Sequence, residues 1–149
     1  MAILAENKKA KFNYEILEKF EAGISLLGQE VKSIKKGRVS LEGSYIISKG
    51  KEFYLAGATI PAYQPQNAPL NYDESRFRKL LLTKKEINYL IGKAKQRGLT
   101  LVPLSLYTKD NLIKLEFAVC RGKRKADKRE KIREREADIE IRRTLKRIY

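Results

Sequence analysis

The last 29 residues of this chain cannot form a core, so any fold must be built from the residues before them. Positions 121–149 contain no proline, one glycine and almost no bulky apolar residues before Ile132. They carry 13 Lys or Arg and 6 Asp or Glu, which gives this fifth of the chain nearly half of the total net charge of +15. Such a segment buries too little apolar surface to offset its ordering entropy. We therefore predict a folded domain at 1–120 and a basic tail at 121–149.

The apolar residues before position 121 predict short strands and turns. Alternation favours strands at 13–20, 40–48, 52–60, 100–107 and 112–120, and 23–28 continues the first of them. The stretches 49–51 (KGK) and 109–111 (KDN) are typical of tight hairpin turns, and the proline-rich stretch 61–72 indicates a surface loop. About six strands with few helices fit a small antiparallel barrel, closed or partly open.

Two short helices are expected within this barrel. Residues 29–36 place Val31 and Ile34 on one side, with Glu30 and the lysines on the outer face, and Gly37 ends the helix. Thr83 and Glu86 have the spacing of a capping box, which predicts a second helix that ends at Gly98.

The composition argues against most enzyme classes. The chain has no histidine, which removes the commonest general base and zinc ligand, and no glycine-rich phosphate loop. A single cysteine, Cys120, permits no internal disulfide, and its place at the end of an apolar run favours a buried strand residue. No apolar run approaches the roughly 20 residues of a membrane span, and the N-terminus does not resemble a secretory signal. We expect a cytoplasmic protein that is not an enzyme and needs no metal or cofactor.

The charge points to a polyanionic partner, RNA or DNA. Lys8, Lys9 and Lys11 form one basic cluster, which also fits a frayed, solvated chain end, and a second cluster surrounds Phe77. Glu21 and Glu30 are acids, which repel RNA, and each has two possible interpretations. Each either pairs with a nearby lysine, which is the default, or accepts hydrogen bonds from the donor edge of a base.

The tail has enough helix-forming residues to become a helix when bound, although like-charged pairs such as Glu130 and Glu134 oppose it in the free protein. A solvated terminal helix without a binding role is the alternative.

Several motifs along the chain together resemble the SmpB family (SsrA-binding protein, small protein B). In order, these motifs lie at 20–23 (FEAG), 28–34 (GQEVKSI), 44–45 (SY), 78–82 (RKLLL), 101–107 (LVPLSLY), 122–124 (GKR) and 127–129 (DKR). The resemblance covers nearly the whole chain. It departs at Phe12 and Ala126, where many members carry histidine, and at Ala137, where some carry tryptophan.

The resemblance implies an oligonucleotide-binding-type barrel with two or three short helices and no catalytic activity. Such a protein binds the tRNA-like part of transfer-messenger RNA (tmRNA, SsrA RNA) and delivers it to stalled ribosomes for trans-translation. It is expected to be a monomer that binds tmRNA 1:1. The tail is disordered when free and becomes helical in the empty mRNA channel beside the decoding centre. DNA and membranes are not expected partners. A generic barrel that binds ribosomal RNA and an RNA-processing enzyme with a carboxylate-bound metal remain as alternatives.

Charge and resemblance together yield two sets of candidate site residues. The expected tmRNA contacts are Asn7, Lys8, Lys9, Lys11, Glu21, Glu30, Lys32, Arg78, Lys79, Leu81 and Lys114. The expected ribosome-binding residues of the tail are Lys123, Arg124, Asp127, Lys128, Arg129, Ile132 and Arg133.

Overall fold

The structure, a computed structural model, describes residues 2–64, 66 and 71–122. All the tail residues predicted to bind the ribosome, and the predicted change of the tail from disorder to helix, lie outside this part. The strands are β1 (Ala2–Glu6), β2 (Tyr14–Ile24), β3 (Tyr45–Lys49), β4 (Glu52–Ala56), β5 (Arg78–Leu81), β6 (Leu99–Lys109) and β7 (Leu112–Gly122). The helices are α1 (Lys8–Asn13), α2 (Gly28–Lys35) and α3 (Lys84–Ala94).

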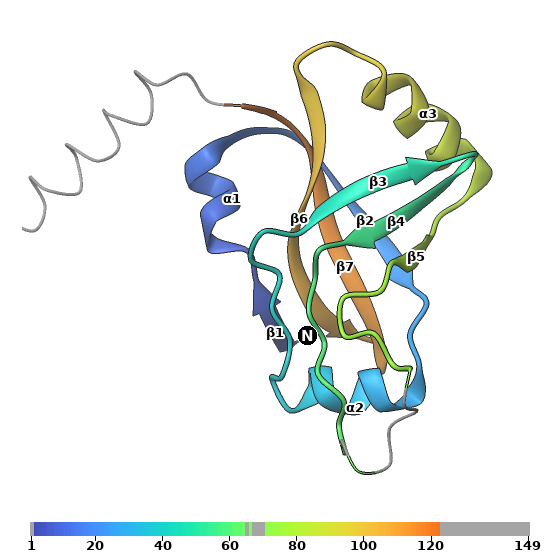
Figure 1. Cartoon of the computed structure of the whole chain (residues 1–149). Helices are drawn as coiled ribbons and strands as arrows, with labels where there is room; N and C mark the ends of the chain where they lie inside the picture. The colour runs from blue at the N-terminus through green and yellow to red at the C-terminus, as the bar shows by residue number, and fades with distance from the viewer. Residues whose placement is uncertain (1, 65, 67–70, 123–149) are drawn as a thin grey trace, which may run out of the picture.

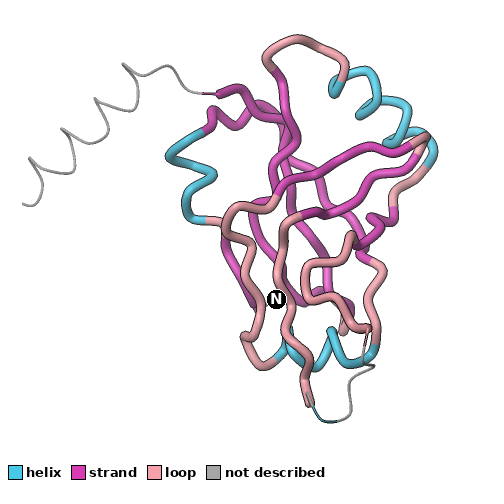
Figure 2. The backbone as a smooth tube through the Cα atoms, viewed as in Figure 1, coloured by secondary structure: helices cyan, strands magenta, loops and turns pink. Residues whose placement is uncertain are grey.

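The seven strands form one antiparallel sheet in the order β1-β6-β7-β2-β5-β4-β3. β3 also lies against β6, so the sheet curls round on itself, and the helices sit around its outside (Figure 2). α2 lies across one end of the strands, while α1 and α3 lie at opposite sides (Figure 1). The predicted mainly β, antiparallel fold with a few short helices is confirmed.

Alternating side chains build one main core inside the curled sheet. Phe20, Ala22 and Ile24 of β2 pack in this core, whereas a bulge between Ile16 and Glu18 leaves Tyr14 and Ile16 against a separate cluster around Ala10. Phe53 of β4 and Phe117 of β7 are almost fully buried, and burial of an aromatic side chain of this size contributes roughly 1.5–3 kcal/mol. Ile34 of α2 closes one end of this core.

The N-terminal segment differs from the prediction. The sequence pattern indicated no element before position 13, but β1 pairs with β6, and α1 packs Ala10 on a second cluster that includes Val102, Ala118 and Cys120. Cys120 is fully buried, as predicted, and burial raises the pKa of its thiol to about 11. β1 and α1 are too short to show a clear period.

Local signals fixed several element ends correctly. Thr83 caps α3 through a hydrogen bond from the Glu86 amide, and the Glu86 carboxylate accepts from the Thr83 amide. Asp110 and Asn111 both adopt positive φ, the two-residue turn that suits the twist of a hairpin. The strand predictions overran at 25–28, 40–44 and 57–60, because α2 begins at Gly28 and the chain turns with positive φ at Gly43 and Gly57. β7 extends to Gly122 and so includes the first two residues assigned to the tail.

Candidate nucleic-acid interface

Glu21 is exposed on β2, where this strand pairs with β7. The Tyr107 hydroxyl, from β6, donates a hydrogen bond to Glu21 Oε2 across the intervening strand. Lys109 Nζ lies 3.3 Å from Glu21 Oε1 and 3.4 Å from Oε2. The carboxylate is therefore exposed to solvent yet held from one side.

These neighbours hold Glu21 in its charged form. The hydrogen bond from Tyr107 is the main cause of a Glu21 pKa below its ordinary value, although partial desolvation opposes it, and Lys109 and Lys114 lower it further. Desolvation of the phenol, followed by the same contact with Glu21, raises the pKa of Tyr107. Glu21 is thus an ionised acceptor at neutral pH.

A groove of about 500 Å³ runs beside Glu21 between β2, β5, β7 and the start of α3. Leu81 lines it with a side chain that is 54% exposed, unusual for a leucine on a strand. Gly23 faces Leu81 across the strand pair, and a Cβ on Gly23 would lie only 3.2 Å from the Leu81 Cβ. Apolar side chains, Leu81 among them, and charged groups therefore line the same groove.

The charged groups of the groove have both signs. Lys79 Nζ lies 2.9 Å from Glu52 Oε1, and Lys114 lines the groove from β7. The Tyr54 hydroxyl donates to Glu52 at 2.7 Å. A surface that only attracted phosphates would be uniformly basic. This mixture instead supplies cations for the backbone and carboxylates for hydrogen-bond donors.

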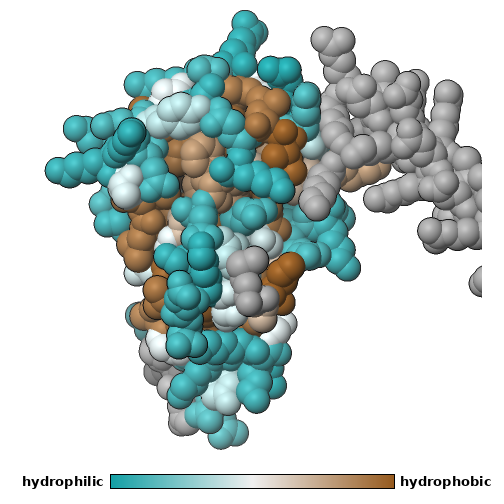
Figure 3. Space-filling view, turned by 180° about the vertical axis from the view of Figure 1, so that it is seen from behind, coloured by the Kyte–Doolittle hydropathy of each residue, from teal (hydrophilic) through white to brown (hydrophobic). Residues whose placement is uncertain are grey.

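The structure brings Glu21, Lys79, Leu81 and Lys114 together, as a single site requires. Figure 3 shows the face of the molecule that is hidden in Figure 1; polar and charged residues cover most of this face and separate smaller apolar areas.

The N-terminal candidates lie in a second place, a hollow of about 240 Å³ at the start of α1. Asn7 is only 9% exposed, and its side-chain amide donates to the Pro103 carbonyl at 2.9 Å, beside the bulge in β6. Lys8 is exposed, and Lys9 pairs with Glu42 at 2.5 Å. Asn7 thus anchors the chain between β1 and α1, and the side chain of Lys11 lies outside the described residues.

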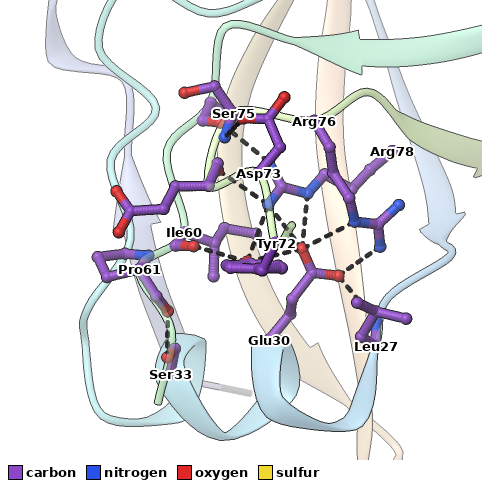
Figure 4. A network of polar contacts seen from close by, with 12 residues as sticks. Leu27, Glu30, Ser33, Ile60, Pro61, Tyr72, Asp73, Ser75, Arg76 and Arg78 are labelled. Carbon is purple, nitrogen blue, oxygen red and sulfur yellow. Dashed lines mark hydrogen bonds and ion pairs between the residues drawn. The ribbon is translucent and has the colours of Figure 1, made fainter. Parts of the chain in front are cut away.

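Glu30 and Arg78 require a correction. Both side chains are fully buried, so the expected outer-face position of Glu30 is wrong. Arg78 Nε and Nη2 donate to Glu30 Oε2 at 2.9 and 2.6 Å, and Arg76 donates to both Glu30 oxygens (Figure 4). This burial removes Glu30 and Arg78 from the side chains that can contact RNA.

The Glu30 network, defined as Glu30, Tyr72, Arg76 and Arg78, ties α2 to β5 and the preceding loop. The Tyr72 hydroxyl donates to Ile60 O at 2.7 Å and lies 3.1 Å from Glu30, and Arg78 also donates to Ala58 O. Burial favours the neutral form of Glu30, but hydrogen bonds from Arg76, the Leu27 amide and Arg78 prevail and lower its pKa. The network is structural.

Lys32 is exposed on α2, and its Nζ lies 5.8 Å from the centroid of the Tyr63 ring. It does not line the groove beside Glu21. Sequence reasoning missed Tyr107 and Lys109, which position Glu21 from 86 and 88 residues away along the chain. A signal for the buried Glu30 did exist: it stands four residues before Ile34 and so shares its helix face.

Across the described ranges, no group of three or more histidine, cysteine, aspartate or glutamate side chains is placed to hold a metal ion. The helices of the same ranges include none with the length and apolarity needed to cross a membrane.

Comparison with known proteins identifies the family. The family model described as SmpB protein matches residues 4–147. The SsrA-binding proteins of Halothermothrix orenii and Gloeothece citriformis are 48% and 44% identical, and each alignment covers 97% of this chain and 92% or 94% of the relative.

A solved chain from work described as "tmRNA-SmpB: a journey to the center of the bacterial ribosome" is 42% identical, with a TM-score of 0.68. It covers 89% of this chain, and the match spans 96% of the solved chain. The folds therefore agree over nearly their whole length, and together with the family model this places the chain in the SmpB protein family.

Proposed function

We propose that this protein is an RNA-binding adaptor that binds the tRNA-like domain of tmRNA and delivers it to stalled ribosomes for trans-translation. It acts in the cytoplasm, binds as a monomer in a 1:1 complex, and catalyses no reaction. Its relatives are named SsrA-binding proteins, and the similar solved chain comes from work on tmRNA, SmpB and the bacterial ribosome.

The observation that carries this proposal is the ionised Glu21 beside an exposed leucine and two lysines. The phosphates of RNA attract cationic side chains. A fixed carboxylate repels phosphate and instead accepts hydrogen bonds from donor groups of the RNA. Folded RNA offers such donors on the edges of unpaired bases and on its 2′-hydroxyl groups. Glu21 therefore supports selection of one folded RNA among many, while Lys79 and Lys114 supply general affinity.

The proposed division of labour assigns tmRNA selection to the barrel and ribosome contact to the tail. The tail residues Lys123, Arg124, Asp127, Lys128, Arg129, Ile132 and Arg133 would enter the empty mRNA channel at the decoding centre. Six carboxylates in the tail support a specific channel over general adhesion to phosphate, since each acid weakens adhesion.

Replacing Glu21 with glutamine tests the selective contact. We expect tmRNA affinity to fall about tenfold, because glutamine keeps the size of the side chain but replaces a charged hydrogen-bond acceptor with a weaker, neutral one. Affinity for bulk tRNA should stay level or rise, and the melting temperature should not change. Filter-binding titrations and thermal unfolding of the full chain measure these quantities.

Glu18→Gln is the matched control, because Glu18 is on the same strand and also accepts from a tyrosine, Tyr89, but does not line the groove. Equal losses of tmRNA affinity and thermal stability in Glu21→Gln would return Glu21 to a purely structural role.

A further inference from the structure

Three clusters of the same composition occur on the described surface, each with a glutamate held by a tyrosine hydroxyl and a lysine. They are Tyr107, Glu21 and Lys109; Tyr54, Glu52 and Lys79; and Tyr89, Glu18 and Lys93. The first differs from the others because its tyrosine is only 5% exposed. Tyr107 is opposite Lys114 on β7 and Ile3 on β1, so it lies between two paired strands.

We propose that Tyr107 is a positioning residue for RNA recognition, which fixes the direction of the Glu21 carboxylate so that its free lone pairs are presented to the groove. This inference rests on the proposed function and assigns a role to a residue that is itself nearly inaccessible to RNA.

The geometry explains how a buried phenol controls an exposed acid. A carboxylate has about four lone-pair positions, and Tyr107 occupies one of those on Oε2. Lys109 approaches both oxygens at 3.3 and 3.4 Å, long distances that leave it replaceable by a ligand. An exposed glutamate without Tyr107 would sample several rotamers, and ordering it would cost binding free energy.

The electrostatic surroundings act in the same direction. The titratable and charged groups near Glu21 are Tyr107 and Lys109 on β6, Lys114 and Glu116 on β7, Lys19 on β2, and Glu52, Lys79 and Glu86 around the groove. Lys19 Nζ is 4.0 Å from Glu116 Oε1, and Glu116 is the residue opposite Glu21 on β7. Tyr107 is the largest influence that lowers the Glu21 pKa, so its removal raises that pKa.

The test is a double-mutant cycle with Tyr107→Phe and Glu21→Gln in the full chain, using the tRNA-like domain of tmRNA as the probe. We expect Tyr107→Phe to weaken binding about tenfold at neutral pH and to have no further effect in the Glu21→Gln background. On acidification, Tyr107→Phe should lose affinity at a higher pH than the wild type, because Glu21 then becomes protonated sooner.

Tyr89→Phe is the control, since it removes the equivalent hydroxyl outside the groove, and it should bind like the wild type. Thermal unfolding of Tyr107→Phe checks that the ring still packs. The inference would be overturned if Tyr107→Phe bound tmRNA like the wild type, or if it lost the same affinity in the wild-type and Glu21→Gln backgrounds. Either result would leave the proposed function standing as long as the wild type still prefers tmRNA to tRNA. A wild type without that preference would overturn the proposed function itself.

Discussion

A chain that stops after Gly122 is expected to keep its preference for tmRNA over tRNA and to lose all peptide tagging on stalled ribosomes. β7 ends at Gly122, which pairs with Tyr14 of β2, so the truncation leaves every described strand intact. The removed residues carry a net positive charge, and their loss should weaken all RNA binding by a similar factor. Binding titrations with both RNAs and a tagging assay on a message without a stop codon measure the two effects.

A full-length chain with alanine at Asp127, Lys128 and Arg129 is the matched control for tail length. It should bind tmRNA like the wild type and tag poorly, because the proposed channel contacts are lost while most of the charge remains. If the truncated chain still supports tagging, the tail has no part in ribosome recognition and the proposed division of labour fails.

Replacing Glu30 with glutamine should lower the free energy of unfolding by about 3–5 kcal/mol, the usual effect of breaking a buried ion pair from one side. The change leaves Arg78, which is fully buried, without its charged partner. A double variant, Glu30→Met with Arg78→Leu, should lose less than Glu30→Gln, because neither buried charge then remains unpaired. Urea unfolding at neutral pH measures all three proteins.

The same pair predicts a pH dependence. The pKa of Glu30 is lower in the folded protein than the ordinary value of 4.5, so its stabilising effect is complete above about that pH. The effect is lost as the pH falls through the lower, folded-state pKa. Wild-type stability should therefore decline more steeply with acidification than that of Glu30→Gln. If the free energies of unfolding of the wild type and Glu30→Gln fell in parallel as the pH was lowered, Glu30 would contribute no charge-dependent stability.

Glu42→Gln controls for the loss of an exposed acid, because Glu42 pairs with Lys9 at the surface. Its stability should change little, as is usual for exposed ion pairs.

The sequence predicted those features that depend on neighbouring residues. The Thr83 capping box and the turn at Asp110 and Asn111 depend on residues close together in the sequence, and the structure confirms both. Alternation predicted the strand β2, but not the bulge that turns Tyr14 and Ile16 to a different cluster from Phe20. The barrel followed from counting such elements. The N-terminal β1 and α1 escaped prediction because their form depends on pairing with β6, about 100 residues away.

The site was predicted only in part, because some of its contacts join residues that are far apart in the sequence. Charge and family resemblance pointed to Glu21, Lys79, Leu81 and Lys114, which the fold gathers at one groove. The partners that hold Glu21 come from a distant strand, and Arg78 is drawn inward by a glutamate 48 residues earlier. A basic residue in a basic cluster has no local mark that it will be buried, so Arg78 was assigned to the surface.

The central claim is that this barrel selects tmRNA beyond what charge alone provides. Dissociation constants of the full chain for tmRNA and for bulk tRNA, measured across a series of salt concentrations, test it most directly. We expect the logarithms of both affinities to fall along parallel lines, with tmRNA bound more tightly at every salt concentration. Two coincident lines would contradict the account and leave a basic protein that binds any RNA.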